Sequence, residues 1–409
     1  MRAGENLNRA LHGLLADDPS VYVLGEDLLD PYGGAFKITK GLSTRFPDRV
    51  LTTPLSEGAV VGAASGLALA GGKAVVEIMF ADFAALAFDQ ILNFASKSVT
   101  MYGTRVPLPL VIRCPSGGHR GYGPTHSQSP QKHFIGIPGL SLFEMSPFHD
   151  NRAVLDRMLA LGEPSLLFED KVLYTRRMFE VDEPFRWDLA GDVAVVRLDS
   201  GDSDVLDIPP GDLDYVLIVP GGVAHRALAA MRSLLLDHDL AGVLMVPSRL
   251  YPFDPSALLP VLGRAPLVCV AEDGSAGGTW GGHVAAGLHT RLWGRLARPV
   301  KLVNSADSVI PTAAHLERDV LVQDATIRRA VLEGPRPAAP ASSPRRPRAG
   351  RAARPRSRHT SRAGPGPSRW CRTTGSRAAG CSRTSRRPRC GGRPGPARGR
   401  RAPAAPATP

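Results

Sequence analysis

Short apolar segments alternate with helix-like segments along this sequence from its start to about residue 334. This alternation is typical of parallel α/β folds, in which buried strands are joined by helices that cover the sheet. A stretch rich in charged residues, Pro and Gly interrupts the alternation, which then resumes. The sequence therefore predicts two parallel-sheet α/β domains, over residues 1–180 and 213–334, with an interdomain connection over 181–212. The segments predicted to form strands are 21–28, 49–54, 73–79, 108–115, 140–145, 165–170, 215–222, 242–248, 266–273 and 300–304.

Four segments have the patterns of helices, and the first of them is unusual. In residues 57–71 most side chains are small, and Gly62, Ala63, Gly66 and Ala70 give the helix a nearly bare surface. Because such a surface allows very close packing, we expect this helix to be buried. The other predicted helices are 82–103, 223–237 and 280–294.

The last part of the chain, residues 335–409, differs sharply in composition from the rest. It contains 20 Arg and 14 Pro but no Lys, Asp, Glu, Leu, Ile, Val, Met, Phe or Tyr. Such a segment buries too little apolar surface to offset the entropy of ordering it, so we expect a disordered tail. The tail could be an Arg-rich arm for nucleic acid or anionic membranes, a tether for a partner, or the product of a shifted reading frame. We favour the shifted frame, because GC-rich codons read out of register give this composition.

The charge of the remaining residues excludes a basic nucleic-acid-binding surface as their main feature. Of the 50 basic side chains, 20 lie in the tail, which leaves 30 basic against 38 acidic side chains and a net charge of −8 for residues 1–334. No apolar run approaches the roughly 20 residues that span a bilayer, and the chain does not begin like a secretory signal. Cysteine is sparse, without the spacing of a disulfide framework or metal site, so we expect a cytoplasmic protein.

Three segments carry side chains that could take part in catalysis. Glu57 opens the predicted small-residue helix after a strand, where it could complement the helix dipole or serve as a buried carboxylate at a ligand-binding edge. Phe80 and Phe83 follow the next strand and could pack in the core or form a flat wall for a ring-shaped ligand. His126 lies in a long Gly-rich loop between two hydroxyl residues that could fix its tautomer. The residues alone leave these alternatives open.

Several blocks of this sequence resemble one enzyme family, and they occur in that family's order. The family is the β subunit of the thiamine-diphosphate-dependent 2-oxoacid dehydrogenase decarboxylating component, of the pyruvate, branched-chain or acetoin type. The similar blocks are TPLSEGAVVGAASGLALAGGKAVVEIMFADFAALAFDQILNFASK, PLVIRCPSGG, HSQSP, IPGLSLFEMSP and EDKVLY and, more loosely, YPFDPSALLP and CVAEDGSAGGTWGGHVAAGL. The resemblance covers roughly residues 1–334 and implies a transketolase-like pyrimidine-binding domain followed by a transketolase C-terminal domain.

The resemblance implies a role for each of three residues. Glu57 corresponds to the carboxylate that hydrogen-bonds the aminopyrimidine of thiamine diphosphate and promotes the tautomer that activates the cofactor. Phe83 corresponds to the aromatic residue that packs on the pyrimidine. His126 corresponds to the histidine near the substrate and the incoming lipoyl group, where an imidazole can transfer protons. In one departure from the family, Leu161 stands where some members have an Asp near a potassium ion, so we do not expect that ion.

One motif that the family's cofactor site needs is missing. Gly-Asp-Gly, which holds the diphosphate through magnesium, does not occur in this sequence. The resemblance therefore implies an α2β2 heterotetramer in which an α subunit supplies the diphosphate and magnesium half of the site. It also implies oxidative decarboxylation of a small 2-oxo acid with acyl transfer to the lipoamide of a lipoyl-bearing acyltransferase. The alternatives are an acetoin-type or transketolase-like ketol-transfer subunit, or a non-catalytic basic interaction protein acting through its tail.

Overall fold

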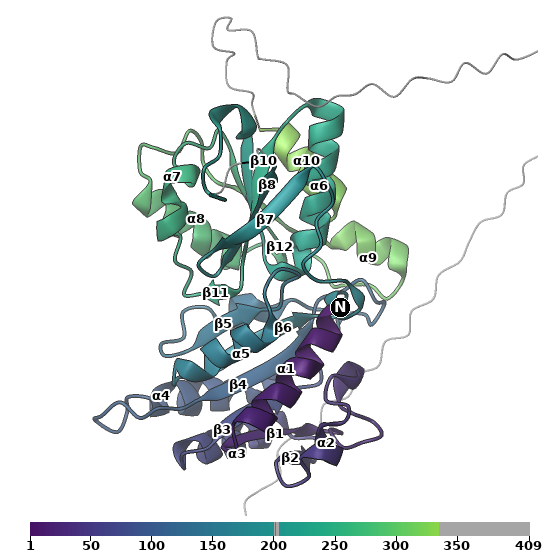
Figure 1. Ribbon diagram of the computed structural model, residues 1–409, viewed down its shortest axis with the longest axis vertical. Helices are drawn as coiled ribbons and strands as arrows, with labels where there is room; N and C mark the ends of the chain where they lie inside the picture. Colours follow the sequence, from purple (N-terminus) through teal and green to yellow (C-terminus); the bar gives the residue numbers. More distant parts are fainter. Residues whose placement is uncertain (200, 202–203, 335–409) are drawn as a thin grey trace, which may run out of the picture. The chain divides into compact units, whose positions relative to one another are not determined.

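Two β-sheets with helices packed on them organise the part of the chain that the structure describes, residues 1–199, 201 and 204–334 of the computed structural model (Figure 1). These residues all belong to one compact unit of the chain. The tail, residues 335–409, lies outside the described residues, so its expected disorder stays a prediction. The predicted fold class of two α/β sheets is confirmed.

The first sheet has seven strands in the order β11-β5-β6-β4-β3-β1-β2. Its six strands from the first half of the chain are parallel, whereas the edge strand β11 comes from the second half and is antiparallel to β5. Each parallel strand overlaps a segment predicted as a strand. Most of these segments are apolar enough to be buried on both faces, whereas the edge strand β2 is largely exposed. The strands are β1 (Val21–Glu26), β2 (Val50–Thr53), β3 (Lys73–Glu77), β4 (Leu110–Ser116), β5 (Ser141–Glu144), β6 (Ser165–Asp170) and β11 (Arg249–Tyr251).

The second sheet has six strands in the order β13-β12-β9-β10-β8-β7. Four of them are parallel and match predicted strands, and the other two form a hairpin that pairs antiparallel with β10. This hairpin lies in residues 181–212, which we interpreted as an interdomain connection. The buried run Val193–Leu198 was missed because the charges, Pro and Gly around it outweigh a short apolar run. The strands are β7 (Phe185–Ala190), β8 (Val193–Leu198), β9 (Tyr215–Ile218), β10 (Gly242–Pro247), β12 (Val268–Ser275) and β13 (Lys301–Ser305).

Helices cover both faces of the first sheet. The long helices α1 and α5 pack together on one face, and α3 packs on the other against β3 and the following segment (Figure 1). Successive residues of β3 show the two faces, since Val75 belongs to the apolar cluster under α1 and Val76 to the cluster under α3. The helices are α1 (Ala3–Asp17), α2 (Leu42–Arg45), α3 (Glu57–Leu69), α4 (Ser96–Ser98), α5 (Asn151–Ala160), α6 (Ala224–His238), α7 (Leu259–Leu262), α8 (Trp280–Arg291), α9 (Ala314–Val320) and α10 (Asp324–Leu332).

Two predicted helices differ from the observed ones. The small-residue helix α3 is buried on one side only, and its other side exposes the small residues Ala59, Ala63 and Gly66. The segment 82–103 is not one regular helix. It consists of the 3-10 helix η2 (Ala81–Ala87), the π-helix η3 (Gln90–Ala95) and the short α4. The changes of pitch let the apolar residues of this segment follow α3, against which both η2 and η3 pack.

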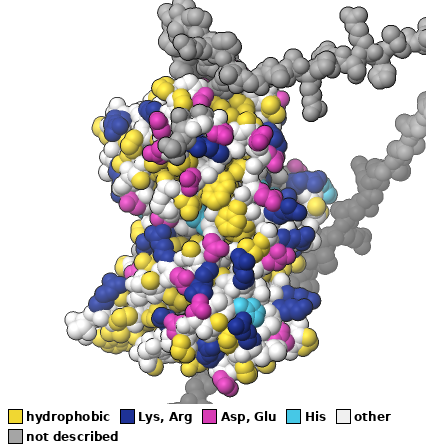
Figure 2. Space-filling model, in the orientation of Figure 1, with side chains coloured by type: hydrophobic (Ala, Val, Ile, Leu, Met, Phe, Trp, Pro, Cys, Tyr) yellow, Lys and Arg dark blue, Asp and Glu magenta, His cyan; other side chains and the backbone are white. Residues whose placement is uncertain are grey.

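One apolar cluster continues from the first sheet into the second, so the two sheets share a core. At their junction Trp280 is fully buried and its Nε1 donates a hydrogen bond to the carbonyl oxygen of Leu250, at 2.8 Å. Basic and acidic side chains are intermixed over the face shown in Figure 2, as the modest net charge of residues 1–334 leads one to expect. In the described part of the chain, no helix combines the length and the apolar character needed to cross a membrane.

The packing of α3 gives a prediction about stability. Ala64 is fully buried against the sheet, so Ala64→Leu should lower the free energy of unfolding by about 1–3 kcal/mol through overpacking. Ala63 is exposed on the same helix, and Ala63→Leu should change it by less than about 0.5 kcal/mol. Urea unfolding of the two purified chains measures both effects. Equal unfolding midpoints for the two variants would contradict the close packing under Ala64.

Candidate functional site

The residues predicted to act in catalysis all follow strands of the first sheet. Glu57 begins α3 after β2, Phe83 lies in η2 after β3, and His126 lies in the loop after β4. The strands β2, β1, β3 and β4 are adjacent and parallel, so their carboxyl ends lie along one edge of the sheet. Open α/β sheets bind their ligands at this edge.

Phe83 and His126 come into contact in the structure. The two rings lie edge to face with their centroids 5.0 Å apart, and the ring of Phe80 meets His126 in the same way at 4.8 Å. The hydroxyl of Thr125 lies 2.9 Å from Nδ1 of His126, so one of the two predicted hydroxyl partners is confirmed. The other, Ser127, has a buried hydroxyl without a hydrogen-bond partner among the described residues. The contacts hold the imidazole by one nitrogen and leave Nε2 directed away from Thr125.

The rings of Phe80, Phe83 and His126 form an aromatic wall at the sheet edge. Two further aromatic residues extend this wall, and the sequence analysis identified neither of them. Tyr122 packs on Phe80 at 5.7 Å between ring centroids, and Phe36 packs on Phe80 at 5.9 Å and on Tyr122 at 6.2 Å. Tyr122 lies in the same Gly-rich loop as His126, which could have drawn attention to it. Phe36 comes from a separate loop after β1 that carried no signal for a functional residue. The wall therefore joins three loops at the sheet edge.

Glu57 is half-buried at the start of α3, and its carboxylate accepts no hydrogen bond from any described residue. The side chain of Ser56, at the N-cap position, makes no capping hydrogen bond. A second carboxyl group, that of Glu26 at the end of β1, lies close by. Burial raises the pKa of Glu26, the negative charge of Glu57 raises it further, and the backbone N–H of Ser56 opposes the shift. An unpaired carboxylate at a helix start beside a second, buried carboxyl group can exchange a proton with a ligand.

The helix of Glu57 packs closely against the segment that carries Phe83. A Cβ atom added to Gly58 would lie 3.3 Å from the carbonyl oxygen of Leu86, at the other end of η2. A Cβ atom at this distance would be tighter than most, so a larger residue would need the neighbouring backbone to shift by a few tenths of an ångström. The segment η2 thus connects the two parts of the site, because the helix of Glu57 packs on it and its Phe83 contacts His126. Among the described residues, no hydrogen bond or ring contact joins Glu57 directly to Phe83 or His126.

A fully buried ion network lies directly below this sheet edge. Arg113 of β4 donates to both oxygens of Glu169 of β6, at 2.7 and 2.9 Å, and to Glu77 of β3, at 2.8 Å. None of these three side chains is exposed. The hydroxyl of Tyr174 donates to Glu169 at 2.6 Å. The sequence did contain a signal for this network, namely the charged residue Arg113 inside the otherwise apolar predicted strand 108–115. A charge in a buried strand implies a buried partner of opposite charge.

The same network holds the loop that carries Phe36. The second oxygen of Glu77 accepts a hydrogen bond from the backbone N–H of Ala35, at 2.7 Å. Gly34 has a φ of 70°, and a side chain there would collide with the carboxylate of Glu77. Only glycine suits both the left-handed backbone and this close approach. Phe36 also packs on Tyr174, at 5.4 Å, so the network fixes this loop at two points.

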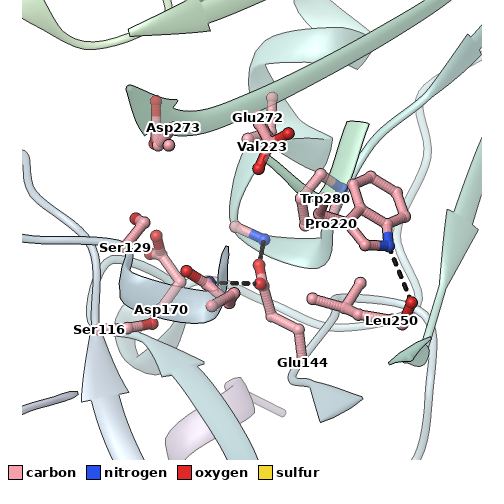
Figure 3. A pocket seen from close by; sticks show the side chains of 13 residues that line it. Ser116, Ser129, Glu144, Asp170, Pro220, Val223, Leu250, Glu272, Asp273 and Trp280 are labelled. Atoms are coloured by element: carbon pink, nitrogen blue, oxygen red, sulfur yellow. Dashed lines mark hydrogen bonds between the residues drawn. The ribbon is translucent and has the colours of Figure 1, made fainter. Parts of the chain in front are cut away.

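A small cavity lined by carboxyl groups lies where the two sheets meet (Figure 3). Glu144 reaches into it from β5 and accepts hydrogen bonds from the backbone N–H of Gly222 and the side chain of Gln131, both at 2.8 Å. Burial raises the pKa of Glu144 to about 8 and that of Asp170 to about 6. The cavity contains none of the three predicted residues, and we assign it to the contact between the sheets.

Comparison with known proteins groups this chain with one set of relatives. Residues 1–177 match the family described as "Transketolase, pyrimidine binding domain". The β subunit of acetoin:2,6-dichlorophenolindophenol oxidoreductase from Cupriavidus necator is 30% identical over 320 residues, which cover 76% of this chain and 90% of that protein. The mitochondrial pyruvate dehydrogenase E1 component subunit beta-1 from Arabidopsis thaliana is 29% identical over 331 residues, which cover 81% of this chain and 88% of that protein.

A third relative and a solved structure agree with this grouping. The pyruvate dehydrogenase E1 component subunit beta from Leifsonia xyli is 39% identical over 169 residues, which cover 41% of this chain and 50% of that protein. The solved structure, described as "Split gene transketolase, inactive beta4 tetramer", has a TM-score of 0.60 at 20% identity and covers 82% of this chain and 98% of its own. At this identity the similarity shows the fold, which is transketolase-like.

The buried network gives a second prediction about stability. Arg113→Met leaves two buried carboxylates without a counter-charge and should lower the free energy of unfolding by about 3–5 kcal/mol. The triple variant Arg113→Met, Glu77→Gln and Glu169→Gln should recover part of this loss, because no charge is left unpaired. The control Arg157→Met removes the exposed pair with Asp192 and should cost less than about 1 kcal/mol. Urea unfolding measures the stability of each variant. If Arg113→Met were as stable as Arg157→Met, Arg113 would not be the counter-charge of Glu77 and Glu169.

Proposed function

Because this chain belongs to the family of β subunits of the 2-oxoacid dehydrogenase decarboxylating (E1) component, we propose that Glu57, Phe83 and His126 form its half of a thiamine diphosphate site. The chain is one subunit of an α–β enzyme that oxidatively decarboxylates a 2-oxo acid with thiamine diphosphate. The observation that carries the proposal is the unpaired carboxylate of Glu57 at the sheet edge where Phe83 and His126 meet.

The residues at this edge fit an aminopyrimidine ring. Glu57 offers a half-buried carboxylate with no protein partner, and Phe83 offers a half-buried ring on η2, the segment against which the helix of Glu57 packs. When bound, thiamine diphosphate supplies the nucleophilic carbon and the electron sink for the loss of carbon dioxide. Glu57 holds a proton at a ring nitrogen of the pyrimidine, and Phe83 packs on the face of that ring. The small residues of α3 let the ligand and the partner subunit approach closely.

His126 acts on the substrate side of the site. Its Nδ1 is engaged by Thr125, and two phenylalanine rings fix the plane of the imidazole. Nε2 is then the atom that exchanges a proton with the substrate or with the acyl acceptor. The lipoyl group of an acyltransferase is the acceptor in this proposal, and the aromatic wall forms the surface along which it approaches.

An α subunit supplies the diphosphate and magnesium half of the site, because the chain has no Gly-Asp-Gly sequence. The face beside Glu57 has the features of a surface that a partner covers. It exposes Leu55 by 81%, Leu86 by 67% and the small-residue side of α3. The proposal also locates the enzyme in the cytoplasm, supported by the free thiols of Cys114 and Cys269.

A specific observation favours a second substrate class. The relative from Cupriavidus necator is named for acetoin, and the similarity to it extends over 90% of its length. The assembled enzyme should therefore be assayed with pyruvate, branched-chain 2-oxo acids and acetoin, with 2,6-dichlorophenolindophenol as the electron acceptor. Turnover of acetoin alone would assign the chain to the acetoin type.

Glu57 is tested by removing its charge in the assembled enzyme. Glu57→Gln should lower turnover by roughly 10²–10⁴-fold at saturating cofactor, because an amide cannot exchange the proton. Calorimetry should show a much smaller loss of cofactor affinity. The control Asp324→Asn removes an exposed carboxylate from the first turn of α10 and should leave turnover unchanged. If Glu57→Gln kept near wild-type turnover, Glu57 would only complement the dipole of α3 and would not take part in catalysis.

The exposed side of α3 is tested by assembly with the α subunit. Ala63→Leu should leave the purified chain folded but prevent formation of the α2β2 complex, because the added side chain holds the partner away from the helix. The unchanged chain should bind thiamine diphosphate tightly only in the complex. Sedimentation and calorimetry measure both results. Normal assembly of Ala63→Leu would show that the partner covers a different face.

A further inference from the structure

Lys171 is buried directly behind the aromatic wall of the proposed site. It follows β6, its side chain has 0% exposure, and its Nζ has no hydrogen-bond partner among the described residues. Nζ lies 5.4 Å from the centroid of the Phe80 ring, and Phe80 in turn contacts His126 at 4.8 Å. A buried ammonium without a partner is costly, so a bridging group has to satisfy it.

Asp82 ties the loop of His126 to the segment that carries Phe80 and Phe83. Its Oδ1 accepts hydrogen bonds from the backbone N–H of Gln128 at 3.3 Å and from Nε2 of Gln128 at 2.8 Å. Asp82 is two residues from Phe80, and Gln128 is two residues from His126, so these bonds fasten the histidine loop to the segment of Phe83. The second oxygen of Asp82, Oδ2, is buried and has no partner among the described residues.

The charges around Lys171 keep it cationic. Burial lowers its pKa to about 8, the negative charges of Asp170 and Asp82 raise it, Arg120 lowers it and Glu317 raises it. The ammonium is therefore mostly protonated at neutral pH. Asp170 makes its hydrogen bond to the backbone N–H of Val172, at 2.8 Å, and not to the ammonium.

Three buried polar atoms on these segments have no hydrogen-bond partner among the described residues: Nζ of Lys171, Oδ2 of Asp82, which is two residues from Phe80, and Oγ of Ser127, which is next to His126. Together they offer three ammonium donors, a carboxylate acceptor and a hydroxyl that can act as either. This set matches the partners of a buried water, which makes about three hydrogen bonds to such groups. Direct contact is not needed, since a bridging water joins two charges nearly as well as a direct bond.

We propose that Lys171 and Asp82 form a buried charge pair, bridged by water, that positions His126 for acyl transfer. This inference rests on the proposed role of His126. Lys171 supports the ring of Phe80 from behind, and Asp82 holds the loop through Gln128, so the pair sets both the surface and the backbone against which the imidazole lies. Neither residue touches substrate or cofactor, and both are positioning residues.

The test uses the assembled α2β2 enzyme and two reactions. Decarboxylation is followed with 2,6-dichlorophenolindophenol, and acyl transfer is followed with lipoamide. Lys171→Met and Asp82→Asn should each lower acyl transfer by roughly 10- to 100-fold, because a small displacement of a catalytic group has effects of this size. Dye-linked decarboxylation should fall far less. The double variant should transfer acyl groups faster than Lys171→Met alone, because it leaves no unpaired buried charge. The exposed Lys40→Met is the matched control and should change neither rate.

His126→Ala separates a failure of the inference from a failure of the proposed function. If His126→Ala slows acyl transfer and neither positioning variant does, the inference is overturned and the role of His126 stands. If His126→Ala leaves both rates unchanged, the proposed role of His126 fails. Equal losses in both reactions for Lys171→Met and Asp82→Asn would show a purely structural effect and also overturn the inference. Asp82→Asn keeps the size of the side chain, so it decides the outcome if Lys171→Met does not assemble.

Discussion

The guanidinium of Arg113 is the group on which the architecture of the sheet edge depends. It lies at the centre of the first sheet and binds carboxylates from the strands on both sides, which pins the ends of β3, β4 and β6 together. Through Glu77 it also holds the loop of Phe36, which completes the aromatic wall. Because all three charges are fully buried, any displacement of one strand end leaves an uncompensated charge in the core. The network therefore gives the loops above it a rigid base.

Several ionisable side chains are buried near this edge, and each is accommodated in a different way. Each of the three side-chain nitrogens of Arg113 donates a hydrogen bond to a carboxylate. Burial raises the pKa of Glu144, and its two oxygens accept hydrogen bonds from Gln131 and from the backbone of Gly222. Lys171 keeps its charge, although its Nζ has no hydrogen-bond partner in the described part of the chain. The difference matters because a satisfied network stiffens a structure, whereas an unsatisfied group marks a place where water or a partner completes it.

The proposed half-site lies on a surface whose form suits a partner. The carboxylate of Glu57, the ring of Phe83 and the imidazole of His126 lie at an edge that is flanked by exposed apolar side chains and by the bare side of α3. A side chain of ordinary size on that side would keep a second subunit several ångströms away. The small residues of α3 pack closely on the sheet on one side and, in the proposed assembly, would allow a partner to approach closely on the other.

The sequence by itself determined the parallel strands and the small-residue helix, and it showed that Glu57, Phe83 and His126 each follow a strand, because strand burial and local motifs act over short stretches of chain. The roles of these three residues rest on the family resemblance. It did not show α1, although Leu7, Leu11 and Leu14 recur at helical spacing, nor the hairpin Phe185–Ala190 and Val193–Leu198. Only the tertiary structure decided that Phe36 and Tyr122 join Phe80, that Arg113 binds Glu77 and Glu169, and that Lys171 lies behind the wall. These contacts join residues far apart in the chain, and their geometry depends on which strands are neighbours, a choice that no local pattern encodes.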